Sequence, residues 1–309
     1  MSKPKLFIHV DSASHFLSWE LPYFARYFDL ANSPGNDTIV FAFGPDVFES
    51  AILLPAKMRV ALLFPGFGLN PYHNLVHKYG MRHIIEKHYD LVFANPGPTA
   101  AAFEDCIKLR LCSFSVNTDL IKFQKSRTGL NALIHISNRH FQKDWTRSRD
   151  IMRMTGLRYE VFPHPVRFRL NWARQRLLRR LFNRKMYHVP GYIAHSVLAR
   201  KYQQNDGFVH VAAEKPPVVD GKYTATLLEA GLTGCLLFWH DTLGMGNDFE
   251  TVFDLPLDPR KAADEILQIR KSVNVPIHSR RTAEEIYEYV NPDRVMKTRF
   301  EAIKEFLNG

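Results

Sequence analysis

Short apolar runs alternate with amphipathic, helix-forming stretches along almost the whole chain. The apolar runs are mostly five or six residues long, and several of them end at Gly or Pro. Strands buried on both faces appear as continuous apolar runs, and helices that cover a parallel sheet connect such strands. The pattern therefore predicts an α/β fold with parallel sheets.

The pattern divides into two halves. The first half predicts strands at residues 5–10, 38–43, 59–64, 90–94 and 111–116, and helices at 16–29, 72–88 and 99–109. Residues 118–131 are polar and interrupt the alternation. The second half predicts strands at 132–137, 158–162, 191–195, 207–211 and 234–239, and helices at 142–156, 223–231, 259–273, 281–290 and 292–307.

A chain of 309 residues is long for a single hydrophobic core. We therefore predict two Rossmann-like domains, residues 1–127 and 128–290. A last helix follows at 291–309, and whether it returns to the first domain is left open. Ligands of such sheets bind at the carboxyl ends of the strands, so two facing domains would place the site in the cleft between them.

Composition excludes several classes of protein. No apolar run reaches the length of a membrane-spanning helix, and the N-terminal apolar run is too short for a signal peptide, so we expect a cytoplasmic protein. The three cysteines are odd in number and lack metal-ligand spacing. The formal net charge of +10 favours an acidic partner, which could be a phosphate ligand, an anionic membrane or a nucleic acid.

One segment of the second half combines features of a nucleotide site. Asp220 and Gly221 follow a predicted strand and precede a predicted helix that contains Glu229. The free N–H groups at a helix N-terminus suit a phosphate, and a glycine lets a diphosphate approach the backbone. A carboxylate at Glu229 could accept hydrogen bonds from both hydroxyls of a ribose. The alternative is an ordinary Glu-Ala pair on a structural helix.

Residues 227–234, Leu-Leu-Glu-Ala-Gly-Leu-Thr-Gly, resemble the donor-site signature of GT-B glycosyltransferases of the family-4-like group. The resemblance implies that Glu229 binds the ribose of a nucleotide sugar. It also implies that the turn of Gly221, Lys222 and Tyr223 contacts the diphosphate or the sugar. The turn departs from the usual Gly-Phe-Gly-like sequence, which leaves the role of Asp220 open.

Two cations follow the first strand of the second half. The resemblance implies that Arg139 and Lys143 lie at the donor diphosphate, where they would neutralise the charge that develops on the leaving group. The alternative is a solvated helix face. The sequence has no Asp-x-Asp motif, and the resemblance implies catalysis without a metal or another cofactor, with the nucleotide sugar as co-substrate. His164, between two prolines at a strand end, is a further donor-site candidate.

The loop after the first strand is the expected acceptor site, because the acceptors of the resembled family meet the N-terminal domain. Asp11 or His15 could take a proton from an acceptor hydroxyl there. The alternative is that Asp11 or Ser14 caps the following helix.

A basic stretch runs between Arg167 and Lys185, with eight cations interleaved with Leu, Phe and Trp. Three interpretations stay open: an interfacial helix on anionic lipid, a nucleic-acid patch, or a surface helix with an apolar stripe packed on its domain. The first would place the enzyme at the inner face of the membrane, next to a lipid-linked acceptor.

Together, the resemblance predicts a glycosyltransferase that moves a sugar from a nucleotide sugar to a glycan or lipid-linked acceptor, as in polysaccharide biosynthesis, and it favours retention of the anomeric configuration. Two alternatives are a GT-B-like nucleotide-sugar epimerase, and a nucleic-acid-binding protein or DNA-modifying sugar transferase.

Overall fold

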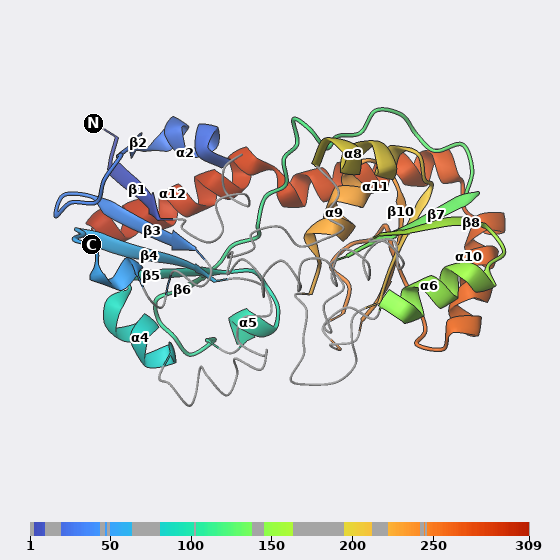
Figure 1. Cartoon of the computed structure of the whole chain (residues 1–309), viewed down its shortest axis with the longest axis horizontal. Helices are drawn as coiled ribbons and strands as arrows, with labels where there is room; N and C mark the ends of the chain where they lie inside the picture. Colours follow the sequence, from blue (N-terminus) through green and yellow to red (C-terminus); the bar gives the residue numbers. More distant parts are fainter. Residues whose placement is uncertain are drawn as a thin grey trace, which may run out of the picture. The chain divides into compact units, whose positions relative to one another are not determined.

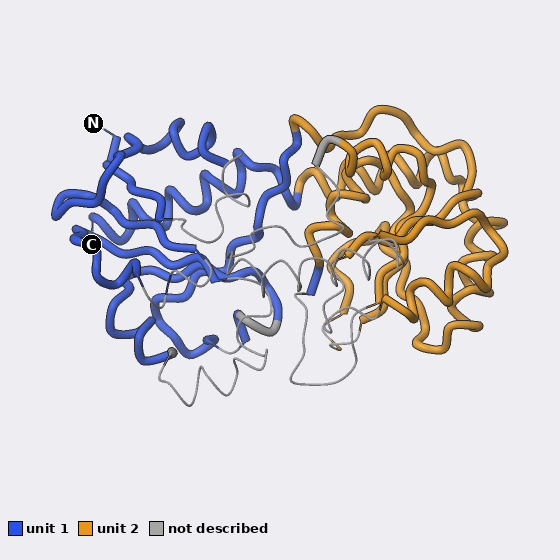
Figure 2. Tube along the Cα trace, viewed as in Figure 1, with its two compact units in different colours: residues 1–118, 215–223, 289–309 blue, residues 119–214, 224–288 orange. Residues whose placement is uncertain are grey.

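A computed structural model of the chain describes residues 3–9, 20–43, 47, 50–63, 81–101, 103–137, 145–162, 195–211, 222–241, 244 and 246–308 (Figure 1). The chain divides into two compact units (Figure 2). Unit 1 comprises Met1–Thr118, Lys215–Tyr223 and Tyr289–Gly309, and unit 2 comprises Asp119–Glu214 and Thr224–Glu288. The chain therefore passes from unit 1 to unit 2 between Thr118 and Asp119, belongs to unit 1 again over Lys215–Tyr223, and returns to unit 1 finally at Tyr289.

Unit 1 is built on a six-stranded sheet with the order β2-β1-β3-β4-β5-β6, in which every pair is parallel. The strands are β1 (Lys5–His9), β2 (Asp29–Leu30), β3 (Ile39–Phe43), β4 (Met58–Leu63), β5 (Leu91–Ala94) and β6 (Leu109–Leu111). All residues of β3 and β5 are buried, which explains their unbroken apolar sequences.

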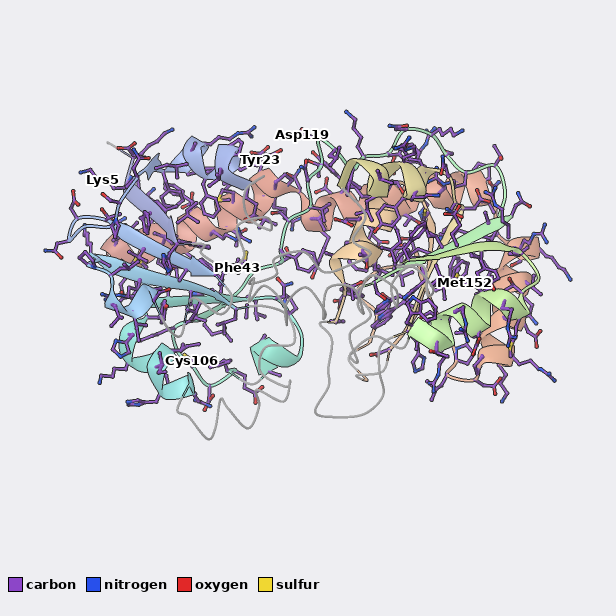
Figure 3. The ribbon with its side chains drawn as sticks, in the orientation of Figure 1. Lys5, Tyr23, Phe43, Cys106, Asp119 and Met152 are labelled. Atoms are coloured by element: carbon purple, nitrogen blue, oxygen red, sulfur yellow. The ribbon has the colours of Figure 1, made fainter. Side chains whose placement is uncertain are left out.

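Helices cover both faces of this sheet. Helix α2 (Leu21–Tyr27) and the last helix, α12 (Pro292–Asn308), pack together over one face, in the core that includes Tyr23 and Phe43 (Figures 1 and 3). The other face carries α4 (Met81–His88), α5 (Pro98–Ala101) and the short 3₁₀ helix η3 (Ala51–Leu53), over a second core that includes Cys106 (Figure 3). The last helix is therefore part of the core of unit 1.

A buried ion pair fixes α12 to the start of the chain. The Arg299 guanidinium is fully buried and donates from Nη1 to Oε2 of Glu20 at 2.9 Å. The other oxygen of Glu20 accepts a hydrogen bond from the Ser115 hydroxyl. The guanidinium also lies 6.0 Å from the ring centroids of Phe24 and Phe41. Each oxygen of this buried carboxylate thus has a partner within the core of unit 1.

Unit 2 has a five-stranded parallel sheet with the order β11-β10-β9-β7-β8. Its strands are β7 (Ala132–Ile136), β8 (Arg158–Phe162), β9 (Gly207–Val211), β10 (Leu236–His240) and β11 (Val252–Asp254). Helices α6 (Trp145–Met154), with Met152, and α10 (Pro259–Ser272) pack together over one face (Figure 3). Helices α8 (His195–Gln203), α9 (Ala225–Leu232) and α11 (Val275–Val290) lie on the other side (Figure 1).

In each sheet the first strand along the chain lies between the second and the third, and the later strands follow the third in order. At the pairs β1/β3 and β7/β9 the chain changes the side of the sheet on which it adds its next strands, while all strands stay parallel. Ligands of open α/β sheets bind at such a switch point, outside the carboxyl ends of the strands. The predicted α/β class with two Rossmann-like sheets is therefore confirmed.

Several predicted elements were wrong in their bounds. The helix predicted at 99–109 is limited to α5, because residues 103–108 form turns that return the chain to β6, where Leu109 pairs with Val92. The strand predicted at 111–116 is correspondingly β6, which ends at Leu111. The predicted strand at 191–195 is wrong at His195, which begins α8. The apolar pattern predicted neither β2 nor β11. It predicted that α11 starts at Arg281, whereas the helix starts at Val275.

The Glu20–Arg299 pair yields a stability prediction. Replacing Arg299 with Met should lower the free energy of unfolding by about 3 to 5 kcal/mol, because it leaves a buried carboxylate without its counter-charge. The double variant Arg299→Met/Glu20→Gln should recover much of this loss. Urea denaturation followed by circular dichroism measures both.

The matched control is Lys5→Met, which breaks the exposed ion pair with Asp37 in the same unit. It should change the free energy of unfolding by less than about 1 kcal/mol. Equal losses in Arg299→Met and Lys5→Met would show that the buried pair has no special role.

Candidate functional site

Strands β7 and β9 separate toward their carboxyl ends. Their backbone pairing joins Leu133 to Gly207 and Ile134 to Phe208. Beyond this point two backbone groups of β9 form hydrogen bonds with side chains. His135 Nδ1 lies 2.7 Å from the Val209 carbonyl oxygen, and the Val211 N–H donates to Ser148 Oγ at 3.1 Å. The switch point of unit 2 is thus held open by side chains.

A polar cluster lies at this opening. A carbonyl oxygen only accepts, so Nδ1 of the buried His135 carries a proton toward Val209. In the neutral ring Nε2 then accepts from the Ser137 hydroxyl, 2.8 Å away. The imidazole of His210 stacks on that of His135, with centroids 5.7 Å apart and planes at 10°. Sequence reasoning missed this cluster, although histidines inside two apolar strands were a visible signal.

Helix α9 (Ala225–Leu232) begins two residues later than the sequence indicated. Thr224 is its N-cap, and the Thr224 hydroxyl accepts a hydrogen bond from the Leu227 N–H at 3.3 Å. The helix was predicted to start at Tyr223, from a turn at Asp220 and Gly221. The Thr224 cap places the start at Ala225 instead, because the threonine hydroxyl gives the Leu227 N–H an acceptor in addition to the Thr224 carbonyl.

Lys222 and Tyr223 precede the cap and belong to unit 1. Both side chains are buried. The Tyr223 ring meets Tyr289 edge-on at 6.2 Å, and Lys222 Nζ lies 5.5 Å from the centroid of the Tyr223 ring. Gly97, with φ of +141°, allows the close approach of Lys222, since a Cβ at Gly97 would lie 3.3 Å from the Lys222 nitrogen.

Glu229 is the one acidic residue of α9, a helix whose residues 227–232 are all buried. Glu229 is 7% exposed to solvent, and its Oε2 accepts a hydrogen bond from the Tyr202 hydroxyl at 3.1 Å. A buried carboxylate in an apolar helix is costly unless hydrogen bonds stabilise it. Its position therefore requires a reason, which is either its contacts within the protein or a ligand in addition to them.

Gly231 allows α9 to lie close to its neighbours. A Cβ at this position would come 2.7 Å from Leu237 of β10 and 2.8 Å from Ile286 of α11. The glycine two residues after Glu229 thus has a packing role.

The remaining predicted site residues lie outside the described residues: Asp11, His15, Arg139, Lys143, His164 and Gly221, together with the stretch from Arg167 to Lys185. Their roles stay predictions. The chain positions next to some of them are described. His9 ends β1, two residues before Asp11 in the sequence, and its Nε2 lies 2.6 Å from Ser50 Oγ.

Among the described residues, no group of three or more His, Cys, Asp and Glu side chains is arranged to hold a metal ion. None of the helices in the described ranges combines the length and the apolar character needed to cross a membrane.

Comparison with known proteins finds likeness in structure. HepE of Anabaena, solved in complex with UDP and glucose, has a TM-score of 0.64 and 12% identity, over 99% of this chain and 100% of HepE. AviGT4, a glycosyltransferase involved in avilamycin A biosynthesis, has a TM-score of 0.60 and 10% identity, over 99% of this chain and 98% of AviGT4. No protein-family model and no curated protein matches the sequence.

TarM of S. aureus, solved with Fondaparinux, alpha-GlcNAc-glycerol and UDP, has a TM-score of 0.59 and 14% identity. The match covers 89% of this chain and 56% of TarM, so this chain spans little more than half the length of TarM. HepE, TarM and AviGT4 are GT-B glycosyltransferases. The chain therefore has the GT-B fold that the sequence resemblance implied.

The cap of α9 yields the second prediction. Thr224→Ala should lower the free energy of unfolding by about 1 kcal/mol, because the Leu227 N–H loses its side-chain acceptor and keeps only the backbone carbonyl of residue 224. Thr224→Ser keeps a hydroxyl at the same place and should change the stability little. Urea denaturation of both variants measures the difference, and equal stability of Thr224→Ala and the wild type would contradict the cap.

Proposed function

We propose that the chain is a glycosyltransferase that transfers a sugar from a nucleotide sugar to a glycan or lipid-linked acceptor. The observation that carries the proposal is the buried Glu229 carboxylate on α9, the helix that follows β9 in the second unit of a GT-B fold. The UDP bound to HepE and to TarM makes a uridine nucleotide the first donor to test.

In the proposed donor site Glu229 accepts hydrogen bonds from the ribose hydroxyls. Arg139 and Lys143 follow β7, beside the switch point with β9, and they neutralise the diphosphate. The turn of Gly221, Lys222 and Tyr223 contacts phosphate or sugar. His164, two residues beyond the end of β8 in the sequence, is proposed to assist donor binding.

In the proposed reaction the bond between the anomeric carbon and the diphosphate oxygen breaks, and its electron pair stays on that oxygen. The two cations stabilise this charge, so no metal ion or other cofactor is required. The acceptor hydroxyl forms the new bond to the anomeric carbon, and its proton passes to Asp11 or His15 in the loop after β1. The configuration at the anomeric carbon is retained.

The acceptor is proposed to be presented at the inner face of the membrane. The eight cations between Arg167 and Lys185, interleaved with apolar side chains, would bind anionic lipid from the cytoplasm. An enzyme held there would meet lipid-linked acceptors of polysaccharide biosynthesis.

The third prediction tests the donor site. One of the ribonucleoside diphosphates UDP, GDP, ADP and CDP should raise the melting temperature, because a ligand that binds only the folded state stabilises it. Glu229→Ala and Arg139→Ala should each weaken binding by about tenfold or more, since each removes a charged hydrogen-bond partner. Isothermal titration calorimetry measures the dissociation constants.

Glu250→Ala is the matched control, because Glu250 is an exposed carboxylate of the same unit, paired with Arg281. Its nucleotide affinity should equal that of the wild type. The absence of binding by all four nucleotides would refute the proposed function. Unchanged affinity in both site variants would refute only the assignment of Glu229 and Arg139.

A further inference from the structure

Tyr202 of α8 holds Glu229 from inside unit 2. Its side chain is fully buried, and its hydroxyl donates to Glu229 Oε2 at 3.1 Å. Its ring meets Phe208 of β9 edge-on, with centroids 6.0 Å apart and planes at 66°. The hydroxyl that contacts Glu229 is therefore at the end of a ring that β9 supports.

The main chain of Tyr202 is fixed as well. Its carbonyl oxygen accepts hydrogen bonds from Arg127 Nη2 at 3.1 Å and from Cys235 Sγ at 3.3 Å. The Arg127 side chain is buried, and its Nη1 donates to the Lys125 carbonyl. Arg127 and Cys235 thus join the end of α8 to the segment before β7 and to the turn before β10. Tyr202 is anchored at its ring and at its backbone.

The phenol of Tyr202 stays a donor over the working pH range. Burial raises its pKa well above the ordinary value, and the nearby charge of Glu229 raises the pKa further. A glutamate side chain has three rotatable bonds, and one fixed donor removes much of that freedom. A carboxylate has about four lone-pair sites, so a bond from Tyr202 is compatible with further bonds from a ligand.

We propose that Tyr202 is a positioning residue, which holds the Glu229 carboxylate in the orientation that accepts the ribose hydroxyls of the nucleotide. This inference rests on the proposed function. A binding group held by a rigid partner loses less freedom when the ligand arrives, so it contributes more to affinity. Tyr202 acts through Glu229 and is not assigned a contact with the nucleotide.

The fourth prediction is the effect of Tyr202→Phe, which removes one oxygen atom and keeps the ring. The dissociation constant of the tightest-binding ribonucleoside diphosphate should rise by about tenfold, as expected for a lost hydrogen bond to a charged group. The 2′,3′-dideoxy form of the same nucleotide should bind equally well to the wild type and to Tyr202→Phe. In a Glu229→Ala background the substitution should have no further effect on affinity. Calorimetry measures all three comparisons.

In turnover assays the same variant should raise KM for the nucleotide sugar by about the same factor and leave kcat nearly unchanged, since the lost interaction serves binding. Tyr89→Phe is the matched control: Tyr89 is also fully buried, and its hydroxyl donates to the Val47 carbonyl in unit 1 at 2.5 Å. The control should leave nucleotide affinity and KM unchanged.

The outcomes separate the two proposals. If the wild type binds none of the nucleotides, the proposed function fails and the role of Tyr202 fails with it. If the wild type binds and Tyr202→Phe binds equally well, only the role of Tyr202 fails. An equal loss for the ribose and dideoxy nucleotides would mean that Tyr202 is merely structural, which also overturns the inference.

If Tyr202→Phe does not fold, the comparison moves to a Glu229→Gln background, in which no buried charge is left without a partner. There Tyr202→Phe should still weaken binding of the ribonucleotide by about threefold, as expected for a bond between neutral groups, and should leave the dideoxy nucleotide unaffected. Equal ribonucleotide affinities of Glu229→Gln and the double variant would overturn the inference.

Discussion

A parallel sheet has to be covered on both faces, and this constraint determines the path of the chain. In unit 1 the described elements before Thr118 supply η3, α4 and α5 for one face and the seven-residue α2 for the other. Helix α12 completes that face with Val295, Met296 and Ile303. The ion pair of Arg299 with Glu20 then fixes the position of α12 on the sheet, because either charge would be costly if it were buried alone.

The same architecture brings the polar groups to the carboxyl ends of the strands. In unit 2 the separation of β7 from β9 leaves backbone groups that His135 and Ser148 satisfy. Buried polar side chains here replace part of the sheet's own hydrogen bonding. The residues that hold the switch point open are thus distinct from Glu229, the proposed ligand contact.

The sequence predicted elements well where the pattern was local. The bounds of β8 and β9 agree with the apolar runs that predicted them, at Arg158–Phe162 and Gly207–Val211. Strands β2 and β11 have two and three residues and exist because a neighbouring strand pairs with them. The helix predicted over 99–109 has suitable residues, but the pairing of Leu109 with Val92 overrides their propensity. For the site, a local motif singled out Glu229 as a candidate. Its hydrogen-bond partner Tyr202 is 27 residues away in the sequence, and His135 bonds Val209, which is 74 residues away. No short motif can record such contacts.

The placement of α12 also has a consequence for biosynthesis. A ribosome emits all six strands of the first sheet, and the whole of unit 2, before it emits residues 292–308. Until then Phe24, Phe41 and their apolar neighbours lack the helix that covers them in the finished protein. Exposed apolar surface on a partly made chain favours aggregation and the binding of chaperones. Unit 1 can therefore complete its core only after translation has passed Ile303, although all six strands of its sheet were made first.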